Sequence, residues 1–115
     1  MRTELTRFRV IDGKSDIVDE WMAFLRDNMK DVLLTLDAEK MYVETIFREK
    51  NEDGEFLYWY SVQGENGQDI RESESWIDKK HLEYWDLCID PKTRSVDMTT
   101  EVVMIPERIA ALMQE

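Results

Sequence analysis

The sequence predicts an α+β fold in which a four-stranded antiparallel sheet is covered by helices on one face. Two observations predict it. Apolar and polar residues alternate in four segments, as in half-buried strands, while two other segments carry apolar residues at every third or fourth position, as in amphipathic helices. The length, 115 residues, fits a single domain spanning residues 1–115.

The first predicted strand covers residues 4–11. Phe8 and Val10 alternate with Arg7 and Arg9, so one face of the strand is apolar and the other is charged. We therefore expect Phe8 to face the helices and both arginines to lie on the opposite face of the sheet.

Residues 15–36 predict a helix that begins at Ser15, whose hydroxyl is expected to cap the first turn. Asp16 and Asp19 follow, near the helix N-terminus, where the helix dipole favours acidic residues. Apolar residues recur at helical spacing, and no Pro or Gly interrupts them. Asn28 could cap a new helix, so two helices are the alternative to one continuous helix.

A β-hairpin is predicted next, because an acidic turn ending in Gly54 joins two segments rich in aromatic and β-branched residues. The turn sets a register in which Phe47 lies opposite Tyr58. We expect this pair to face the helices, with Trp59 on the other side of the sheet. The face expected to remain free of helices carries Arg7, Arg9, Tyr42, Glu44, Ile46, Arg48, Leu57, Trp59, Ser61, Glu101 and Val103.

The polar residues 64–75 predict a loop or a short exposed helix. The second long helix is then expected to begin at an Asp78 cap, with Ile77 and Leu82 packed together as a hydrophobic staple. Asp90-Pro91 ends it, since a proline disfavours helical geometry in the residue before it.

Residues 96–105 alternate again and predict the fourth strand, and Pro106 opens a short C-terminal helix. The complete order, βαββαβ followed by a helix, is the ferredoxin-like pattern. Right-handed crossovers place both long helices on one face of such a sheet. The first strand is then central, between the third and the fourth, and Glu101 is expected near Arg7 and Arg9.

Composition narrows the function classes. The chain has 26 acidic and 15 basic residues, a net charge of -11, which argues against a nucleic-acid partner. It contains no apolar run long enough for a membrane helix and no signal-peptide pattern, and its one cysteine, Cys88, cannot form an internal disulfide. We expect an acidic cytoplasmic protein without a membrane segment.

The sheet face without helices raises the question of what covers it. Trp59, Tyr42, Leu57 and Val103 would add more apolar area to it than a monomer usually exposes. A second copy related by twofold symmetry would hide that area, so we expect a homodimer. The alternative is a solvated face with ordinary ion pairs.

A set of residues also resembles a known family. The segments are Tyr42–Phe47, Tyr58–Tyr60, His81 with Tyr84-Trp85, and Cys88–Asp90. They resemble an uncharacterised bacterial family of small proteins that is similar to the dimeric α/β-barrel superfamily, which includes antibiotic-biosynthesis-type monooxygenases. The resemblance implies a dimer and a small pocket between sheet and helices, but no particular reaction.

Several side chains are candidates for ligand binding. His81 is the only histidine and the natural group for proton transfer near neutral pH; the alternative is a packed histidine at a helix start. Aromatic residues could line a pocket for a flat organic ligand or simply fill the core. Glu44 near two arginines suggests an anionic ligand or a neutralised dimer interior. The candidates are His81, Glu44, Tyr42, Tyr58, Trp59, Trp85, Arg7 and Arg9.

Motifs of metal and cofactor sites are missing from the sequence: it has no second histidine, no cysteine pair and no Gly-rich phosphate loop. We therefore expect neither a metal nor a cofactor. Three functions remain: a homodimer that binds a small molecule, a module that recognises a basic protein, or a cofactor-independent enzyme. The enzyme would be of the monooxygenase or isomerase type, with His81 or Glu44 transferring the proton. Binding is the preferred hypothesis.

Overall fold

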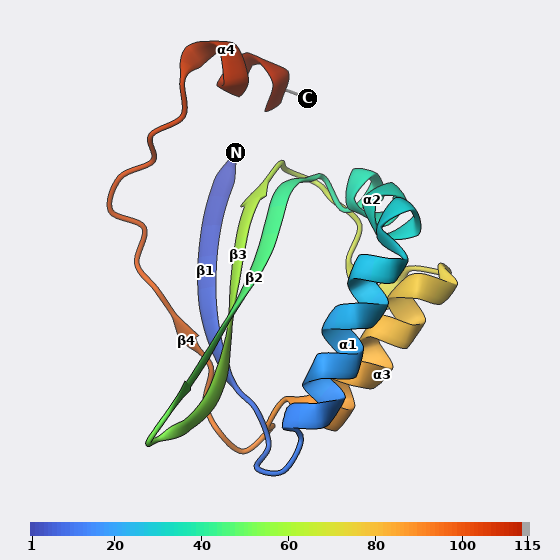
Figure 1. Ribbon diagram of the computed structural model, residues 1–115. Helices are drawn as coiled ribbons and strands as arrows, with labels where there is room; N and C mark the ends of the chain where they lie inside the picture. Colours follow the sequence, from blue (N-terminus) through green and yellow to red (C-terminus); the bar gives the residue numbers. More distant parts are fainter. Residues whose placement is uncertain (114–115) are drawn as a thin grey trace.

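The computed structural model, which describes residues 1–113, contains a four-stranded antiparallel sheet in the order β2-β3-β1-β4. Helices α1, α2 and α3 cover one face of it (Figure 1). This is the ferredoxin-like arrangement, and it confirms the predicted fold class. The elements are β1 (Arg2–Arg9), α1 (Ser15–Asp27), α2 (Met29–Ala38), β2 (Met41–Asn51), β3 (Gly54–Gln63), the 3₁₀ turn η1 (Ile70–Glu72), α3 (Trp76–Cys88), β4 (Val96–Asp97), α4 (Glu107–Ala110) and the 3₁₀ turn η2 (Ala111–Met113).

The predicted helix over residues 15–36 is divided at Asn28, as the alternative anticipated. The Asn28 side chain donates a hydrogen bond to the Phe24 carbonyl oxygen, 2.8 Å away, and so closes the end of α1 rather than capping α2. The predicted Ser15 cap is wrong, because Lys14 occupies the cap position and Ser15 is already helical. The Ser15 hydroxyl instead accepts a hydrogen bond from Arg48.

Arg48 holds the hairpin against α1. Its guanidinium forms ion pairs with Asp19 on α1 and Glu55 on β3, and it donates to the carbonyl oxygen of Ser15. It therefore lies on the helix-covered face of the sheet, opposite to the face predicted for it. A guanidinium at this position is satisfied by three partners, which explains how a charged side chain fits beneath a helix.

The hairpin register is confirmed, but its two faces are exchanged. Phe47 lies opposite Tyr58, as predicted. On β1, however, Phe8 lies opposite Leu57, and directly paired residues share a face. Leu57 and Trp59 therefore face the helices together with Phe8, whereas Phe47 and Tyr58 do not. The turn fixed how the two hairpin strands pair, but not which of their apolar faces meets the helices.

The face that the helices leave open carries both charged and apolar side chains on its two central strands, β1 and β3. Arg7 and Arg9 are on it, as predicted, and the Arg7 guanidinium lies 4.9 Å from the centre of the Phe56 ring. Phe47 is 56% exposed. The hairpin residues on this open face are Val43, Thr45, Phe47, Phe56, Tyr58, Tyr60 and Val62.

Helix α3 begins earlier than predicted. Trp76 is its first residue and Ser75 precedes it in an extended conformation, so Asp78 is not the cap. Both Ile77 and Asp78 lie in the first turn and are buried. The sequence placed the start too late because Asp is favoured both as a cap and within the first turn.

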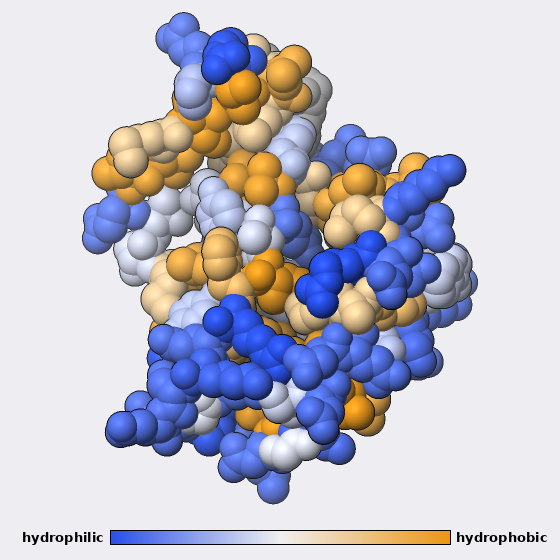
Figure 2. Space-filling model, in the orientation of Figure 1, coloured by the Kyte–Doolittle hydropathy of each residue, from blue (hydrophilic) through white to orange (hydrophobic). Residues whose placement is uncertain are grey.

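The fourth strand is much shorter than predicted. Only Val96–Asp97 is a strand, and Val96 lies opposite Arg7, so Glu101 is not the neighbour of the two arginines. Met98 still donates to the Leu5 carbonyl oxygen and the Thr100 hydroxyl bonds to that of Thr3, and beyond them the chain leaves the sheet and carries α4 toward the N-terminus (Figure 1). Val102 and Met104 there are 70% and 85% exposed. Figure 2 shows apolar residues gathered along this C-terminal segment, at the upper left of the view.

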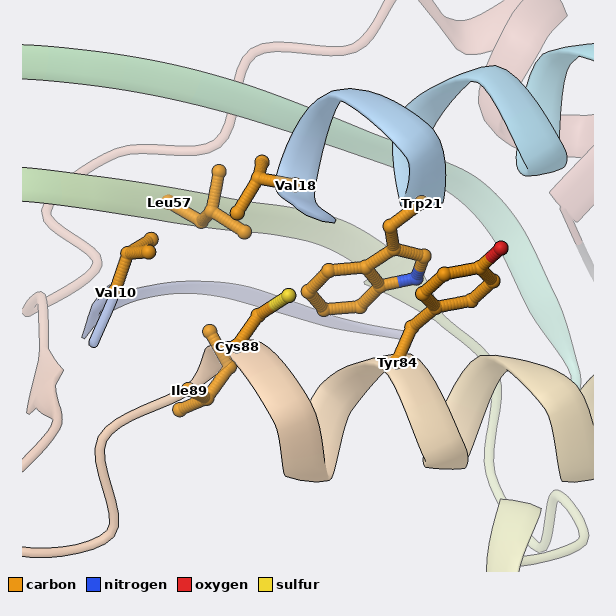
Figure 3. Packing of buried hydrophobic residues seen from close by; sticks show 7 residues of the cluster. All are labelled: Val10, Val18, Trp21, Leu57, Tyr84, Cys88 and Ile89. Atoms are coloured by element: carbon orange, nitrogen blue, oxygen red, sulfur yellow. The ribbon is translucent and has the colours of Figure 1, made fainter. Parts of the chain in front are cut away.

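The core lies between the sheet and helices α1 and α3. Trp21 is fully buried at its centre, with its ring 5.5 Å from that of Trp59 and 6.4 Å from that of Tyr84. Figure 3 shows its indole reaching from α1 toward α3, beside Tyr84 and the sulfur of Cys88. In residues 1–113 no helix is both long and apolar enough to cross a membrane.

Candidate functional site

The helix-covered face of the sheet also forms one wall of a cavity. This larger cavity, of about 710 Å³, lies between the sheet and α3 and is bordered by the loop 64–69. A smaller cavity of about 290 Å³ lies among α1, α2, α3 and β2 and is mostly apolar. The residues that line both cavities are Glu39, Glu44, Ile70 and His81.

A hydrogen bond from Trp21 in the core fixes the orientation of the His81 ring on α3. The Trp21 Nε1–H donates to His81 Nδ1 over 2.9 Å. Burial lowers the pKa of His81 from 6.5 to about 4, and the charge of Asp78 offsets this only in part. The ring is therefore neutral at neutral pH. Because an indole nitrogen only donates, Nδ1 must accept, and the ring hydrogen is on Nε2.

Glu44 projects from β2 into the same space. One of its carboxylate oxygens accepts a hydrogen bond from Trp59 Nε1 at 3.0 Å. Burial raises the pKa of Glu44, the bond from Trp59 lowers it, and the negative charge of Asp78 raises it. Glu44 is therefore a carboxyl group with increased basicity, whereas His81 on the wall of the same cavity can only donate from Nε2, so Glu44 is the better proton acceptor of the two.

Glu39, at the end of α2, is a site residue that the sequence analysis did not identify. Burial, followed by the charges of Asp78, Glu44 and Asp69, raises its pKa to about 8. Its Oε1 atom is buried and has no hydrogen-bond partner among residues 1–113. No sequence pattern identifies Glu39 as a site residue, because an acidic residue between a helix and a strand is usually exposed to solvent.

The loop after β3 fixes the position of Glu39. The Gln68 amide donates to the Ala38 carbonyl oxygen at 2.9 Å, next to Glu39. Gly67 is required in this contact, since a Cβ atom there would lie 2.0 Å from the carbonyl oxygen of Glu39. The loop thereby closes over the end of α2 and forms the rim of the larger cavity.

Two indoles form the aromatic wall of the larger cavity. The rings of Trp59 on β3 and Trp85 on α3 are 5.3 Å apart and meet edge to face. Phe8 packs against Trp85 at 4.6 Å and belongs to the same wall. Aromatic faces next to a carboxyl group and an imidazole are a typical lining for a polar organic ligand.

Of the eight predicted ligand-binding residues, the structure brings four together at this cavity: His81, Glu44, Trp59 and Trp85. The other four do not line it. Tyr58 is on the open face and donates to Glu49, while Arg7 and Arg9 are on that face near Phe56. Tyr42 occupies a register irregularity at the start of β2. The predicted cluster of Glu44 with the two arginines is therefore wrong, since the sheet separates them.

Comparison with known proteins supports the fold. No curated protein matches the sequence significantly. Among solved structures, the chain is similar to the L-rhamnose mutarotase FA22100 from Formosa agariphila, with a TM-score of 0.55 and 17% sequence identity. The match covers 93% of this chain and all of the mutarotase chain. A likeness at this identity shows the ferredoxin-like fold and no shared activity.

The family comparison agrees with the expectation of an uncharacterised family of small proteins. The matching family model covers nearly the whole chain, from the first strand through the C-terminal helix α4. On this match to residues 1–111, the protein belongs to the family of unknown function DUF6176.

Proposed function

We propose that the protein binds a small polyhydroxylated molecule, of the monosaccharide class, in the larger cavity. The observation that supports it best is the position of Glu44 and His81 beside the indoles of Trp59 and Trp85 on the walls of one cavity. Sugars offer apolar ring faces that pack on indoles and hydroxyl groups that donate to a carboxylate and accept from an imidazole N–H. The fold similarity to a protein named as a rhamnose mutarotase favours the same ligand class.

Tryptophan fluorescence tests the binding. We expect L-rhamnose or D-glucose to change the emission of the wild-type protein saturably, because two of its four tryptophans line the cavity. Trp59→Phe should lose most of this change. Trp76→Phe is the matched control, since Trp76 is 54% exposed and lies outside both cavities, and it should keep the change. If no monosaccharide alters the emission, the proposal is wrong.

A second candidate function is the interconversion of sugar ring forms. It is favoured because Glu44 can accept a proton, whereas His81 can only donate a hydrogen bond from Nε2. Glu44 would remove the proton of the anomeric hydroxyl as the bond between the anomeric carbon and the ring oxygen breaks. A water molecule would protonate the ring oxygen and take the anomeric proton from Glu44 in turn, so no hydroxide remains, and the ring oxygen would accept a hydrogen bond from His81 Nε2. The open-chain aldehyde then closes to either anomer by the reverse steps, so no cofactor is needed.

We also propose that two copies associate through their open sheet faces. Phe47 is 56% exposed there beside Tyr58 and Tyr60, and isolated chains rarely leave such an area uncovered. Sedimentation at tens of micromolar should give a dimer, and Phe47→Glu should shift it to the monomer by burying a charge in the interface. A wild-type protein that sediments only as a monomer contradicts this proposal.

A further inference from the structure

Resting on the proposed sugar-binding function, we infer that the ligand is a sugar with an apolar substituent, a benzene-sized ring or a short alkyl chain, and that this substituent occupies the smaller cavity. The sugar itself lies in the larger cavity, beside Trp59 and Glu44. The lining of the smaller cavity, its origin in the fold and its position next to the larger cavity support this assignment.

The smaller cavity is lined as a site for a hydrocarbon group. It lies among α1, α2, α3 and β2, has a volume of about 290 Å³ and is mostly apolar. A cavity of roughly 150 Å³ with such a lining takes up benzene, so this one has room for a ring or a short chain. A helix of another protein, about 10–12 Å across with its side chains, is too large for it. Its apolar side chains include Met22, Leu25, Val32, Leu36, Ile46 and Ile77.

Helix α2 leaves its apolar face partly open, and this creates the cavity. The chain ends α1 at Asn28 and continues into α2 at an angle to it (Figure 1). Although most residues of α2 are apolar, none of its side chains is fully buried. Val32 and Leu36 are half-buried and line the cavity. Because amphipathic helices normally bury their apolar face, an apolar group in this cavity would complete the packing of α2.

The position of the smaller cavity places its occupant next to the sugar. Four residues line both cavities, and Glu44 and His81, the polar groups assigned to the sugar, are among them. Of the other charged residues in its lining, Arg26 is exposed, and Asp78 precedes His81 by about one turn of α3, so it belongs to the shared end. A ligand that is polar at one end and apolar at the other matches this order of linings.

Two glucosides that differ only in their apolar group test this inference: phenyl β-D-glucopyranoside and methyl β-D-glucopyranoside. Calorimetric titration of the full chain should show the phenyl glucoside binding at least about tenfold more tightly, because its ring leaves water. A glycoside cannot open its sugar ring, so the titration reports binding alone. Equal affinities would overturn the inference and leave the proposed sugar binding intact, whereas no binding of either glucoside would overturn both.

A pair of variants on α2 assigns the substituent to the smaller cavity. Val32→Phe fills this cavity with the enlarged side chain, so the two glucosides should then bind within about twofold of each other. Leu34→Phe is the matched control, because Leu34 is 64% exposed and lies outside both cavities, and it should keep the tenfold preference. A preference that survives Val32→Phe, in a variant whose circular dichroism matches the wild type, would place the phenyl ring elsewhere and overturn the assignment.

NMR of the wild-type protein with the phenyl glucoside tests the same assignment without a variant. Nuclear Overhauser effects should connect the phenyl protons with methyl groups of Val32 and Ile77, which line the smaller cavity and not the larger one. Effects to the indole protons of Trp85 instead would mean that the phenyl ring stacks in the larger cavity, which would overturn the inference.

Discussion

Replacing Glu44 with Gln is expected to slow the interconversion of sugar anomers by about 100-fold or more, while the sugar stays bound. The amide keeps the size of the side chain and an oxygen that can accept from Trp59 Nε1, as the carboxylate does at 3.0 Å. What it loses is the ability to take a proton. His81 cannot replace it, because Trp21 occupies Nδ1 and the hydrogen is on Nε2.

Exchange between the α and β anomers, followed by NMR with catalytic amounts of protein, measures this rate. Glu49→Gln is the matched control, since Glu49 is on the same strand and accepts a hydrogen bond from Tyr58 on the open face. It should leave the rate unchanged. A Glu44→Gln variant as fast as the wild type would exclude Glu44 as the base, and a wild type without acceleration would exclude the catalytic proposal while leaving binding untouched.

Replacing Trp21 with Ala is expected to lower the free energy of unfolding by about 3–5 kcal/mol, a large part of the total for a domain of this size. Trp21 is fully buried and packs against Trp59, Trp85 and Tyr84, so its loss leaves a cavity at the centre of the core. The variant also removes the indole N–H that donates to His81 Nδ1.

Urea denaturation followed by circular dichroism measures the loss. Trp76→Ala removes the same side chain from a position that is 54% exposed, where the indole meets the Phe24 ring edge to face, and should cost no more than about 1 kcal/mol. Similar losses in the two variants would mean that the core does not depend on Trp21.

Much of the fold follows from local patterns. Alternation in residues 4–11 and 41–63 and helical spacing in residues 15–36 predicted the order of elements, and the hairpin turn predicted the pairing of Phe47 with Tyr58. These features depend on neighbours in the sequence, so they can be recognised there. The predicted fourth strand is too long because alternation continues to Ile105, whereas the backbone hydrogen bonds to β1 continue only as far as Met98.

The assembly of the candidate site was much harder to predict from the sequence than the order of the elements. His81, Glu44, Trp59 and Trp85 stood out by residue type, but the sequence placed Glu44 and Trp59 on the wrong face of the sheet. Glu39 carried no signal, since its role depends on burial beneath a loop that Gly67 brings into contact with the end of α2.

The sequence by itself determined the type and order of the elements, the ferredoxin-like sheet and the residue types available for chemistry. Only the tertiary structure decided which face of the hairpin meets the helices and hence which side chains share a cavity. The reason is that both faces of the hairpin are rich in apolar residues, so the alternation does not show which face packs against the helices. Packing of Trp59 and Leu57 with Phe8 and Trp21 selects one face, and that choice separates Glu44 from the arginines and places it on the wall of the same cavity as His81.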